Sequence, residues 1–328
     1  MRLLSEKLID EILPVELAID AADEAFRVSS DGSTIVPLRS EILREDPKTV
    51  MLVMSGLVGD GILGVKLVGS VHRPGAAKGT ACMMLILDAK TLQVRGLLSA
   101  DRLNEHRTAA GFASATRLLA RPEAGTHLVI GAGKLAYTAA LYVAQVRPIR
   151  RLLLASRTPE KVLALASHLS ADPRMQAVEI VANPDLRAAV ESADVITTVT
   201  TSASPVFDGT WLRAGTHVNL GGAFRKDHRE MDDLAARRAS FWLDSSAACR
   251  ERSGDVVQAL ASGALEEGRI RGEIGELLLG RIPGRASAEE ITVFKSLGIA
   301  SQDLVLGARL LDLAEARNLG TVFDEKQG

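Results

Sequence analysis

The fold is decided by ten residues, 127–136, which read HLVIGAGKLA. The apolar run 127–130 is typical of a short buried strand, and the residues after the glycines have the pattern of a helix. Gly131 permits a tight turn, Gly133 lets the backbone approach a pyrophosphate, and Ala136 is small enough for close helix–strand packing. Strand, glycine turn and helix in this order predict a dinucleotide-binding turn. An ordinary glycine turn without a ligand is the alternative.

Short apolar strands and helices alternate along the chain after this turn. The pattern predicts helices over 135–145, 161–169 and 186–192, and strands over 151–155, 177–181, 194–200, 216–220 and 240–244. Such alternation is typical of a doubly wound parallel sheet with right-handed crossovers. The predicted class is therefore α/β, with a Rossmann fold.

The flanking segments predict a second α/β region. Helices are expected over 14–26 and 107–120, and strands over 51–54, 65–68 and 82–87. From about residue 291 the chain is expected to be irregular, until a final helix over 302–316 packs back on the first region. The prediction is a Rossmann domain, 119–292, inserted in a discontinuous substrate-binding domain formed by 1–118 and 293–328.

The composition excludes several classes of partner. The 328 residues carry a net charge of -2, so no basic excess supports binding to nucleic acid or to an anionic membrane. No run approaches the ~20 apolar residues of a membrane span, and the N-terminus lacks the apolar core of a signal peptide. Cys82 and Cys249 form no CxxC pair and fit a reducing compartment, although one disulfide is compatible with the sequence. We expect a soluble cytoplasmic protein.

Selectivity between nicotinamide dinucleotides is expected at the end of the second strand. An NAD-binding turn usually has a carboxylate there, which bonds the ribose hydroxyls. Here the position holds Ser156-Arg157-Thr158. Arg157 offers a planar cation to a 2′-phosphate, and both hydroxyls can donate to it. NADP(H) is the predicted preference and NAD(H) the alternative; Arg157 could instead stack on the adenine or cap a surface turn.

Seven segments, taken together and in order, resemble the ornithine cyclodeaminase/mu-crystallin family. They are 64–68 (GVKLV), 107–110 (RTAA), the turn at 131–136, 193–196 (ADVI), 215–219 (GTHVN), 253–256 (SGDV) and 292–298 (TVFKSLG). The resemblance covers nearly the whole chain. It implies that the substrate-binding domain also dimerises, and that the chain is a homodimeric enzyme acting on α-amino or α-imino carboxylates with a nicotinamide cofactor.

One position separates the branches of this family. Cyclodeaminases carry an Asp two residues after a glycine in the stretch that matches Gly222-Ala223-Phe224, and this chain has Phe224 there. Phenylalanine cannot exchange a proton, and reducing an existing imine needs less acid–base help than deamination with cyclisation. Residues 222–233 look more like mu-crystallin, the ketimine reductase branch, so reduction of a ketimine is favoured.

The family's carboxylate pocket maps onto Arg39, Lys66 and Arg107, and Lys66 and Arg107 are predicted to be catalytic. A lysine in the apolar strand 64–68 is unfavourable unless it meets an anion; the alternative is an edge strand from which Lys66 reaches solvent. Arg107 is expected to begin a helix. A cation at a helix N-terminus interacts unfavourably with the helix dipole, so a purely structural role is disfavoured there. Arg39 follows Pro37-Leu38 and could be a surface arginine.

The predicted cofactor site extends beyond the glycine turn. Resemblance alone adds Thr108, Leu220 and Ser296, while Thr200 and Thr201 end a strand on the expected cofactor side, where β-branched residues are common in any case. The full set is Thr108, Gly131, Gly133, Lys134, Leu135, Ala136, Ser156, Arg157, Thr158, Thr200, Thr201, Leu220 and Ser296.

Other titratable residues have simpler explanations. The six histidines form no HxH or HExxH pattern, so no metal site is predicted. His228, near Phe224, is the alternative acid, although a surface histidine explains it as well. Asp303 matches a family acid near the active site and would serve equally as a helix N-cap.

The favoured function is NAD(P)H-dependent reduction of a cyclic or small α-imino carboxylate, such as pyrroline-2-carboxylate or piperideine-2-carboxylate, to the L-amino acid. Amino acid dehydrogenation with ammonia, as in alanine dehydrogenases, and a cyclodeaminase using another acid are the alternative enzymes. A nucleotide-binding protein without turnover is the remaining alternative. Lys66 and Arg107 argue against it, since a pure binder need not keep that pair.

Overall fold

The computed structural model describes residues 1–37, 40–45, 48–72 and 79–323. Contacts divide the chain into two compact units, 1–107 with 299–328 and 108–298. The first boundary lies within helix α3, Asp101–Leu119. No helix among the described residues is both long enough and apolar enough to cross a membrane. The assignment of the two units to substrate and to dinucleotide stays a prediction.

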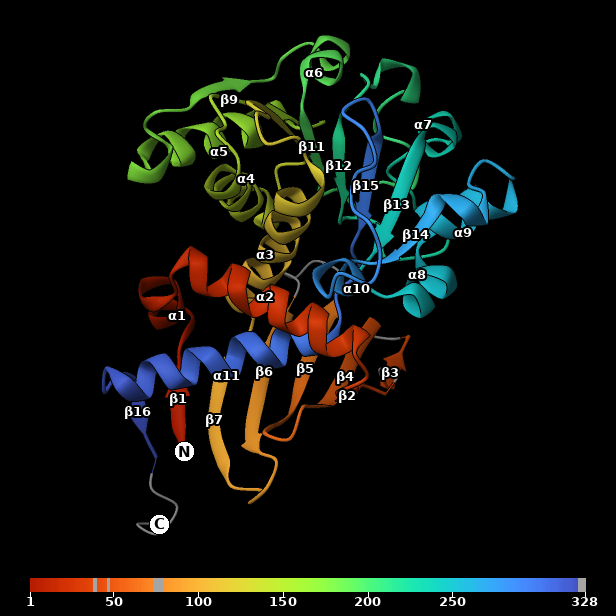
Figure 1. Ribbon diagram of the computed structural model, residues 1–328. Helices are drawn as coiled ribbons and strands as arrows, with labels where there is room; N and C mark the ends of the chain where they lie inside the picture. The colour runs from red at the N-terminus through yellow and green to blue at the C-terminus, as the bar shows by residue number, and fades with distance from the viewer. Residues whose placement is uncertain (38–39, 46–47, 73–78, 324–328) are drawn as a thin grey trace. The chain divides into compact units, whose positions relative to one another are not determined.

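The first unit is a mostly antiparallel sheet with helices on one face (Figure 1). The described strands follow the order β16-β1-β7-β6-β5-β4-β2, and β3 pairs with β4. Its elements are β1 (Arg2–Leu4), α1 (Glu6–Ile12), α2 (Val15–Ser30), β2 (Thr34–Ile35), β3 (Ser40–Arg44), β4 (Lys48–Val58), β5 (Ile62–His72), β6 (Gly79–Asp88), β7 (Val94–Ser99), α11 (Ala300–Ala316) and β16 (Thr321–Val322).

Alternating side chains give this sheet two different faces. On β6, Met84 and Ile86 are fully buried, and Met84 reaches Gly307 of α11. Met83, which directly precedes Met84, points to the other face and is 36% exposed. Helix α11 contacts α2 and strands β4 to β7. The predicted packing of the C-terminal helix on the first region is confirmed.

The second unit is a parallel sheet whose successive strands are connected mostly by helices (Figure 1). The order is β10-β9-β8-β11-β12-β15-β13-β14. Its elements are β8 (Thr126–Ile130), α4 (Lys134–Val146), β9 (Arg151–Ala155), α5 (Pro159–Ala171), β10 (Glu179–Ala182), α6 (Leu186–Ser192), β11 (Val195–Thr198), β12 (His217–Leu220), α7 (Asp233–Arg238), β13 (Ala239–Leu243), α8 (Ser246–Arg252), α9 (Gly254–Ala261), β14 (Ile270–Glu273), α10 (Ile274–Leu278) and β15 (Ile291–Lys295). The predicted doubly wound sheet is confirmed, and its direction of winding reverses between β8 and β11, where such folds bind ligands.

One expectation for this unit is wrong. The chain is expected to be irregular from about residue 291, but Ile291–Lys295 forms β15, which lies between β12 and β13 in the middle of the sheet. All five residues are buried. A strand buried on both faces has no alternation to reveal it, and its partners come from earlier parts of the chain.

Two histidines belong to the interior of the second unit. His127 Nε2 lies 2.9 Å from Thr197 Oγ1, and His217 Nδ1 lies 2.9 Å from Thr292 Oγ1. Both rings are completely buried, and burial lowers the pKa of each to about 3. These histidines are therefore neutral at physiological pH and join strands of the sheet.

Candidate active site

The glycine turn lies between β8 and α4, as predicted. Gly131 has a φ of +122°, and a Cβ there would lie 2.6 Å from the carbonyl oxygen of Val199, so no side chain fits. Nothing lies within 4 Å of a Cβ built at Gly133, which leaves open space beside the turn. No side chain caps α4, so its first N–H groups can bind an anion.

A cavity of about 680 Å³ opens at the carboxyl ends of β8, β9 and β11. Its size is typical of a small-molecule site. The predicted cofactor residues in its wall are Gly131, Gly133, Ser156, Arg157, Thr158, Thr200 and Thr201. Strand β11 ends at Thr198, so Thr200 and Thr201 lie in the following loop and do not end the strand as expected. An anion-binding turn beside this cavity fits a dinucleotide.

Two charged side chains, Arg157 and Lys161, occur in the described lining of this cavity. Both are basic, and the described lining contains no carboxylate. Sequence reasoning does not single out Lys161, because the helix is expected to start there. Helix α5 begins at Pro159 instead, which places Lys161 in its first turn. Proline is frequent at the first position of a helix, so Pro159 was the signal in the sequence that could have placed Lys161 in the first turn.

The other predicted cofactor residues lie outside the described lining of the cavity. They are Thr108 in α3, Lys134, Leu135 and Ala136 in the first turn of α4, Leu220 at the end of β12 and Ser296 after β15. Their contact with a cofactor stays a prediction.

The first unit contains a buried cluster of polar side chains. Lys66 Nζ lies 2.7 Å from Asp303 Oδ2 and 3.2 Å from Asn104 Oδ1. Arg107 Nη2 donates to Asn104 Oδ1 at 2.6 Å, and its Nε lies 3.3 Å from Asp303 Oδ1. Lys66 is 2% exposed and lies on β5, between β4 and β6. The edge-strand explanation of Lys66 is therefore wrong, because β5 is an internal strand and the ammonium faces α11.

The cluster has two basic side chains and one carboxylate. Burial lowers the pKa of Lys66, the Asp303 carboxylate opposes this shift, and Arg107 adds to it. With Lys66 protonated the cluster carries an excess positive charge away from water, which is unfavourable unless an anion balances it. The arrangement suits an anionic ligand beside an ammonium that can donate a proton.

Two details predicted for this cluster are wrong. Helix α3 begins at Asp101, so Arg107 lies in its second turn, where the effect of the dipole has largely faded. Asp303 does not cap α11, which begins at Ala300; its carboxylate pairs with Lys66 and Arg107. The case for these residues therefore rests on their contacts and burial.

Asn104 joins the cluster although sequence reasoning does not name it. It precedes Arg107 by three residues on α3, a spacing that places two side chains on one helix face, and this was the available signal. Arg39 lies outside the residues that the structure describes, so its contact with a carboxylate stays a prediction.

Phe224 lies in the loop after β12 and is 54% exposed. The nearby Asp227 pairs with Arg225 and His228, and these contacts, led by Arg225, lower the pKa of Asp227 to about 2. Asp227 is thus ionised at neutral pH and is a poor proton donor. His228 Nδ1 lies 2.9 Å from Asp227 Oδ1.

The sequence model of the ornithine cyclodeaminase/mu-crystallin family matches residues 2–317. The chain belongs to this family. It is similar to a Delta(1)-pyrroline-2-carboxylate reductase of Bacillus cereus, with 33% identity over 90% of this chain and 91% of that protein. It is also similar to the ketimine reductase mu-crystallin of Mus musculus, with 32% identity over 94% of this chain and 96% of that protein. The family predicted from the seven segments is confirmed.

Two solved structures have the same fold as this chain. The Delta(1)-pyrroline-2-carboxylate reductase of Thermococcus litoralis, in complex with NADH and L-proline, has a TM-score of 0.90 at 30% identity and covers 98% of this chain and 100% of its own. An archaeal alanine dehydrogenase dimer with bound NAD has a TM-score of 0.89 at 23% identity over 99% of each chain. The second likeness shows the fold alone.

Proposed function

We propose that this family member reduces a cyclic or small α-imino carboxylate, such as pyrroline-2-carboxylate or piperideine-2-carboxylate, to the L-amino acid with NAD(P)H. The observation that carries the proposal is the buried cluster of Lys66, Arg107, Asp303 and Asn104. An imino acid has a carboxylate for the cations and a nitrogen that takes up a proton on reduction. The relatives named as pyrroline-2-carboxylate and ketimine reductases support this chemistry.

Each residue of the cluster has a task in this proposal. When bound, the nicotinamide cofactor would supply the hydride for reduction of the imine carbon. Arg107, with Arg39, holds the carboxylate through paired hydrogen bonds and so fixes the position of that carbon. Lys66 holds the carboxylate or donates its proton to the nitrogen, and Asp303, 2.7 Å from Nζ, favours the protonated lysine.

The proposed cofactor preference is NADPH over NADH. The backbone at Gly131 and Gly133, with the N-terminus of α4, would hold the pyrophosphate. Arg157, Ser156 and Thr158 would hold the 2′-phosphate. The absence of a carboxylate from the described lining of the cavity supports this preference, because nothing there would repel the phosphate.

A screen of imine and oxo substrates tests the reaction. Purified protein is expected to oxidise NADPH rapidly with pyrroline-2-carboxylate or piperideine-2-carboxylate, and slowly with pyruvate and ammonia, as followed by cofactor absorbance. The opposite order of rates would support an amino acid dehydrogenase. Intact cofactor binding without any turnover would support a nucleotide-binding protein.

The lyase alternative has a separate test. With L-ornithine and catalytic NAD⁺, the protein is expected to release no ammonia, because Phe224 stands where cyclodeaminases have an acid. The neighbouring Asp227, whose pKa is lowered mainly by Arg225, is a poor proton donor in its place. Ammonia and proline formed together would contradict this expectation, and His228→Asn would then be the variant to examine.

A homodimer is proposed from the uncovered face of the first sheet. On the face opposite α11, Met83 of β6 is 36% exposed, and Ile42 of the edge strand β3, which the strand registers place on the same face, is 60% exposed. A second copy would cover such apolar surface with the same residues.

The oligomeric state tests this proposal. Light scattering is expected to give about twice the chain mass of 34.9 kDa. Met83→Glu should shift the protein towards monomer, whereas the control Leu92→Glu, in an exposed turn, should leave the dimer unchanged. A wild-type protein that is monomeric at micromolar concentration would contradict the proposal.

The compartment proposed for this enzyme is the cytoplasm. Cys82 and Cys249 are buried and unpaired, which supports a reducing environment.

A further inference from the structure

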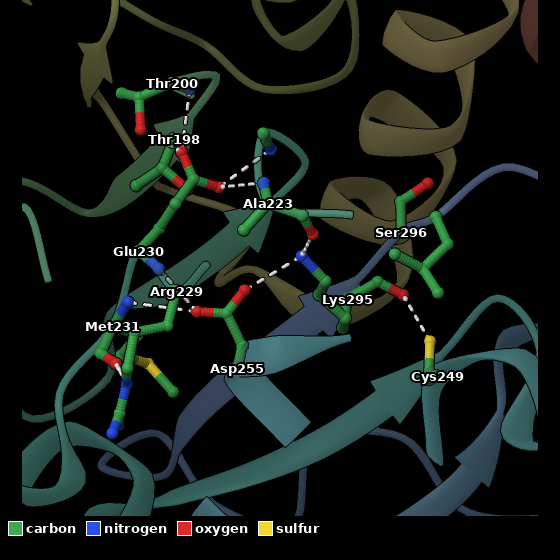
Figure 2. A network of polar contacts seen from close by, with 12 residues as sticks. Thr198, Thr200, Ala223, Arg229, Glu230, Met231, Cys249, Asp255, Lys295 and Ser296 are labelled. Atoms are coloured by element: carbon green, nitrogen blue, oxygen red, sulfur yellow. Dashed lines mark hydrogen bonds and ion pairs between the residues drawn. The ribbon is translucent and has the colours of Figure 1, made fainter. Parts of the chain in front are cut away.

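We infer that Glu230 is a positioning residue for the cofactor cavity, an inference that rests on the proposed function. Its fully buried carboxylate joins the loops that follow β11 and β12 (Figure 2). Oε1 accepts hydrogen bonds from N and Oγ1 of Thr200, both at 2.7 Å. Oε2 accepts from N of Gly222 at 2.7 Å and from N of Ala223 at 3.3 Å. One side chain therefore holds two backbone segments at the carboxyl edge of the sheet.

The first of these segments forms part of the cavity wall. Thr200, Thr201 and Ser202 line the cavity, whereas Glu230 lies outside its described lining. The two segments also touch each other, because a Cβ at Gly222 would lie 2.0 Å from the carbonyl oxygen of Thr200. Glu230 thus acts on the cavity through Thr200, and a shift of one loop would move the other.

Glu230 is itself held by a second buried carboxylate. Asp255 Oδ1 accepts from N of Glu230 at 2.7 Å and from N of Met231 at 3.1 Å. Asp255 Oδ2 lies 2.9 Å from Lys295 Nζ, which also donates to the carbonyl oxygen of Ala223 at 2.7 Å (Figure 2). Both the NH and the carbonyl of Ala223 are therefore bound by this network, immediately before Phe224.

The lysine of the network keeps its charge. Burial lowers the pKa of Lys295, but the carboxylates of Asp255 and Glu230 outweigh burial, so the pKa is raised. The network brings together residues 253–256 and 292–298 through the contact of Asp255 with Lys295, and neither of these two residues has a task in the proposed reaction. Buried ion pairs are weak contributors to stability compared with apolar packing, whereas a carboxylate with four donors restricts where two backbone segments can lie.

Glu230→Gln tests the inference directly. Glutamine keeps the size of the side chain but has one acceptor oxygen instead of two, so one loop loses its acceptor. The dissociation constants of NADPH and NADH, measured by fluorescence of the bound reduced cofactor, are expected to rise by a common factor of about tenfold, the effect of losing a hydrogen bond to a charged group. A common factor is expected because Thr200 follows β11, whereas Arg157, which would distinguish the two cofactors, follows β9, and β8 lies between these strands.

A matched variant separates positioning from stability. Asp194 accepts from N of Gly125 at 2.9 Å and N of Thr126 at 3.0 Å at the opposite, amino edge of the same sheet. Asp194→Asn should lower Tm but leave both dissociation constants unchanged. If Glu230→Gln does not fold, Asp255→Asn, one contact further from the cavity, should raise both constants by a smaller factor.

Three outcomes would overturn the inference. They are a folded Glu230→Gln that binds both cofactors as the wild type does, an equal loss of binding in Asp194→Asn, and unfolding of both network variants while Asp194→Asn folds. The last would assign the network to stability. Because binding is measured without an imine, a wild type that binds NADPH but reduces no imine would contradict the proposed reaction and leave this test valid.

Discussion

Lys66→Met is expected to lower kcat/KM for a cyclic ketimine by about 10²-fold or more, the usual scale for loss of a general acid. Methionine fits the apolar strand β5, and Asp303 retains Arg107 as a partner at 3.3 Å, so the fold should persist. Steady-state rates at several imine concentrations, with cofactor binding measured separately, check this expectation. Lys48→Met, which removes an exposed lysine from the neighbouring strand β4, should leave the rate unchanged.

Two further measurements distinguish the tasks proposed for Lys66. Lys66→Arg keeps the charge but does not release a proton at ordinary pH, so a restored KM without a restored kcat would indicate proton donation. The rate should fall as pH rises, since the active forms are the iminium and the protonated lysine. Burial lowers the pKa of Lys66 below its usual value, and the Asp303 carboxylate opposes this shift. Asp303→Asn removes that opposition, so the decrease in rate should occur at lower pH in this variant. A Lys66→Met enzyme as fast as the wild type would contradict both tasks.

Arg157→Ala is expected to weaken NADPH binding by about 10- to 100-fold, the range for losing hydrogen bonds to a charged group. NADH binding should change little, because only NADPH carries the 2′-phosphate. Fluorescence titration with each reduced cofactor measures the two constants. An equal loss of affinity for NADPH and NADH would remove the basis for the predicted preference. It would indicate that Arg157 contacts a part of the cofactor that NADPH and NADH have in common.

The chain offers a matched arginine as a control. Arg151 begins β9 at the amino edge of the sheet and lies 3.4 Å from Glu179, whereas Arg157 follows the same strand at the carboxyl edge. Arg151→Ala should leave both constants unchanged. Lys161→Ala should weaken NADPH binding by less than Arg157→Ala, because a lysine contributes a point charge without paired hydrogen bonds.

Local patterns predict most of the second unit. The turn between β8 and α4 has a sequence signature because it depends on neighbouring residues: Gly131 is required by its positive φ and by the close approach of Val199, and Gly133, two residues later, leaves open space beside the turn. Helices α4, α5 and α6 are also predicted, within a few residues, because their apolar positions repeat at helical spacing, whereas the short helices α7 to α10 are not predicted. β15 is missed because all of its side chains are buried, so its sequence has no alternation of apolar and polar residues. Its place in the sheet depends on neighbouring strands that come from earlier parts of the chain.

The sequence by itself therefore determined the dinucleotide turn, the α/β class and the family, all of which depend on short segments. Only the tertiary structure decided what surrounds Lys66, because Asp303 is 237 residues away along the chain and nothing near either residue indicates the other. The same holds for the network at Glu230, whose partners Asp255 and Lys295 are 40 residues apart. A buried charge is explained by the groups that balance it, and in this protein folding brings those groups from distant strands and helices.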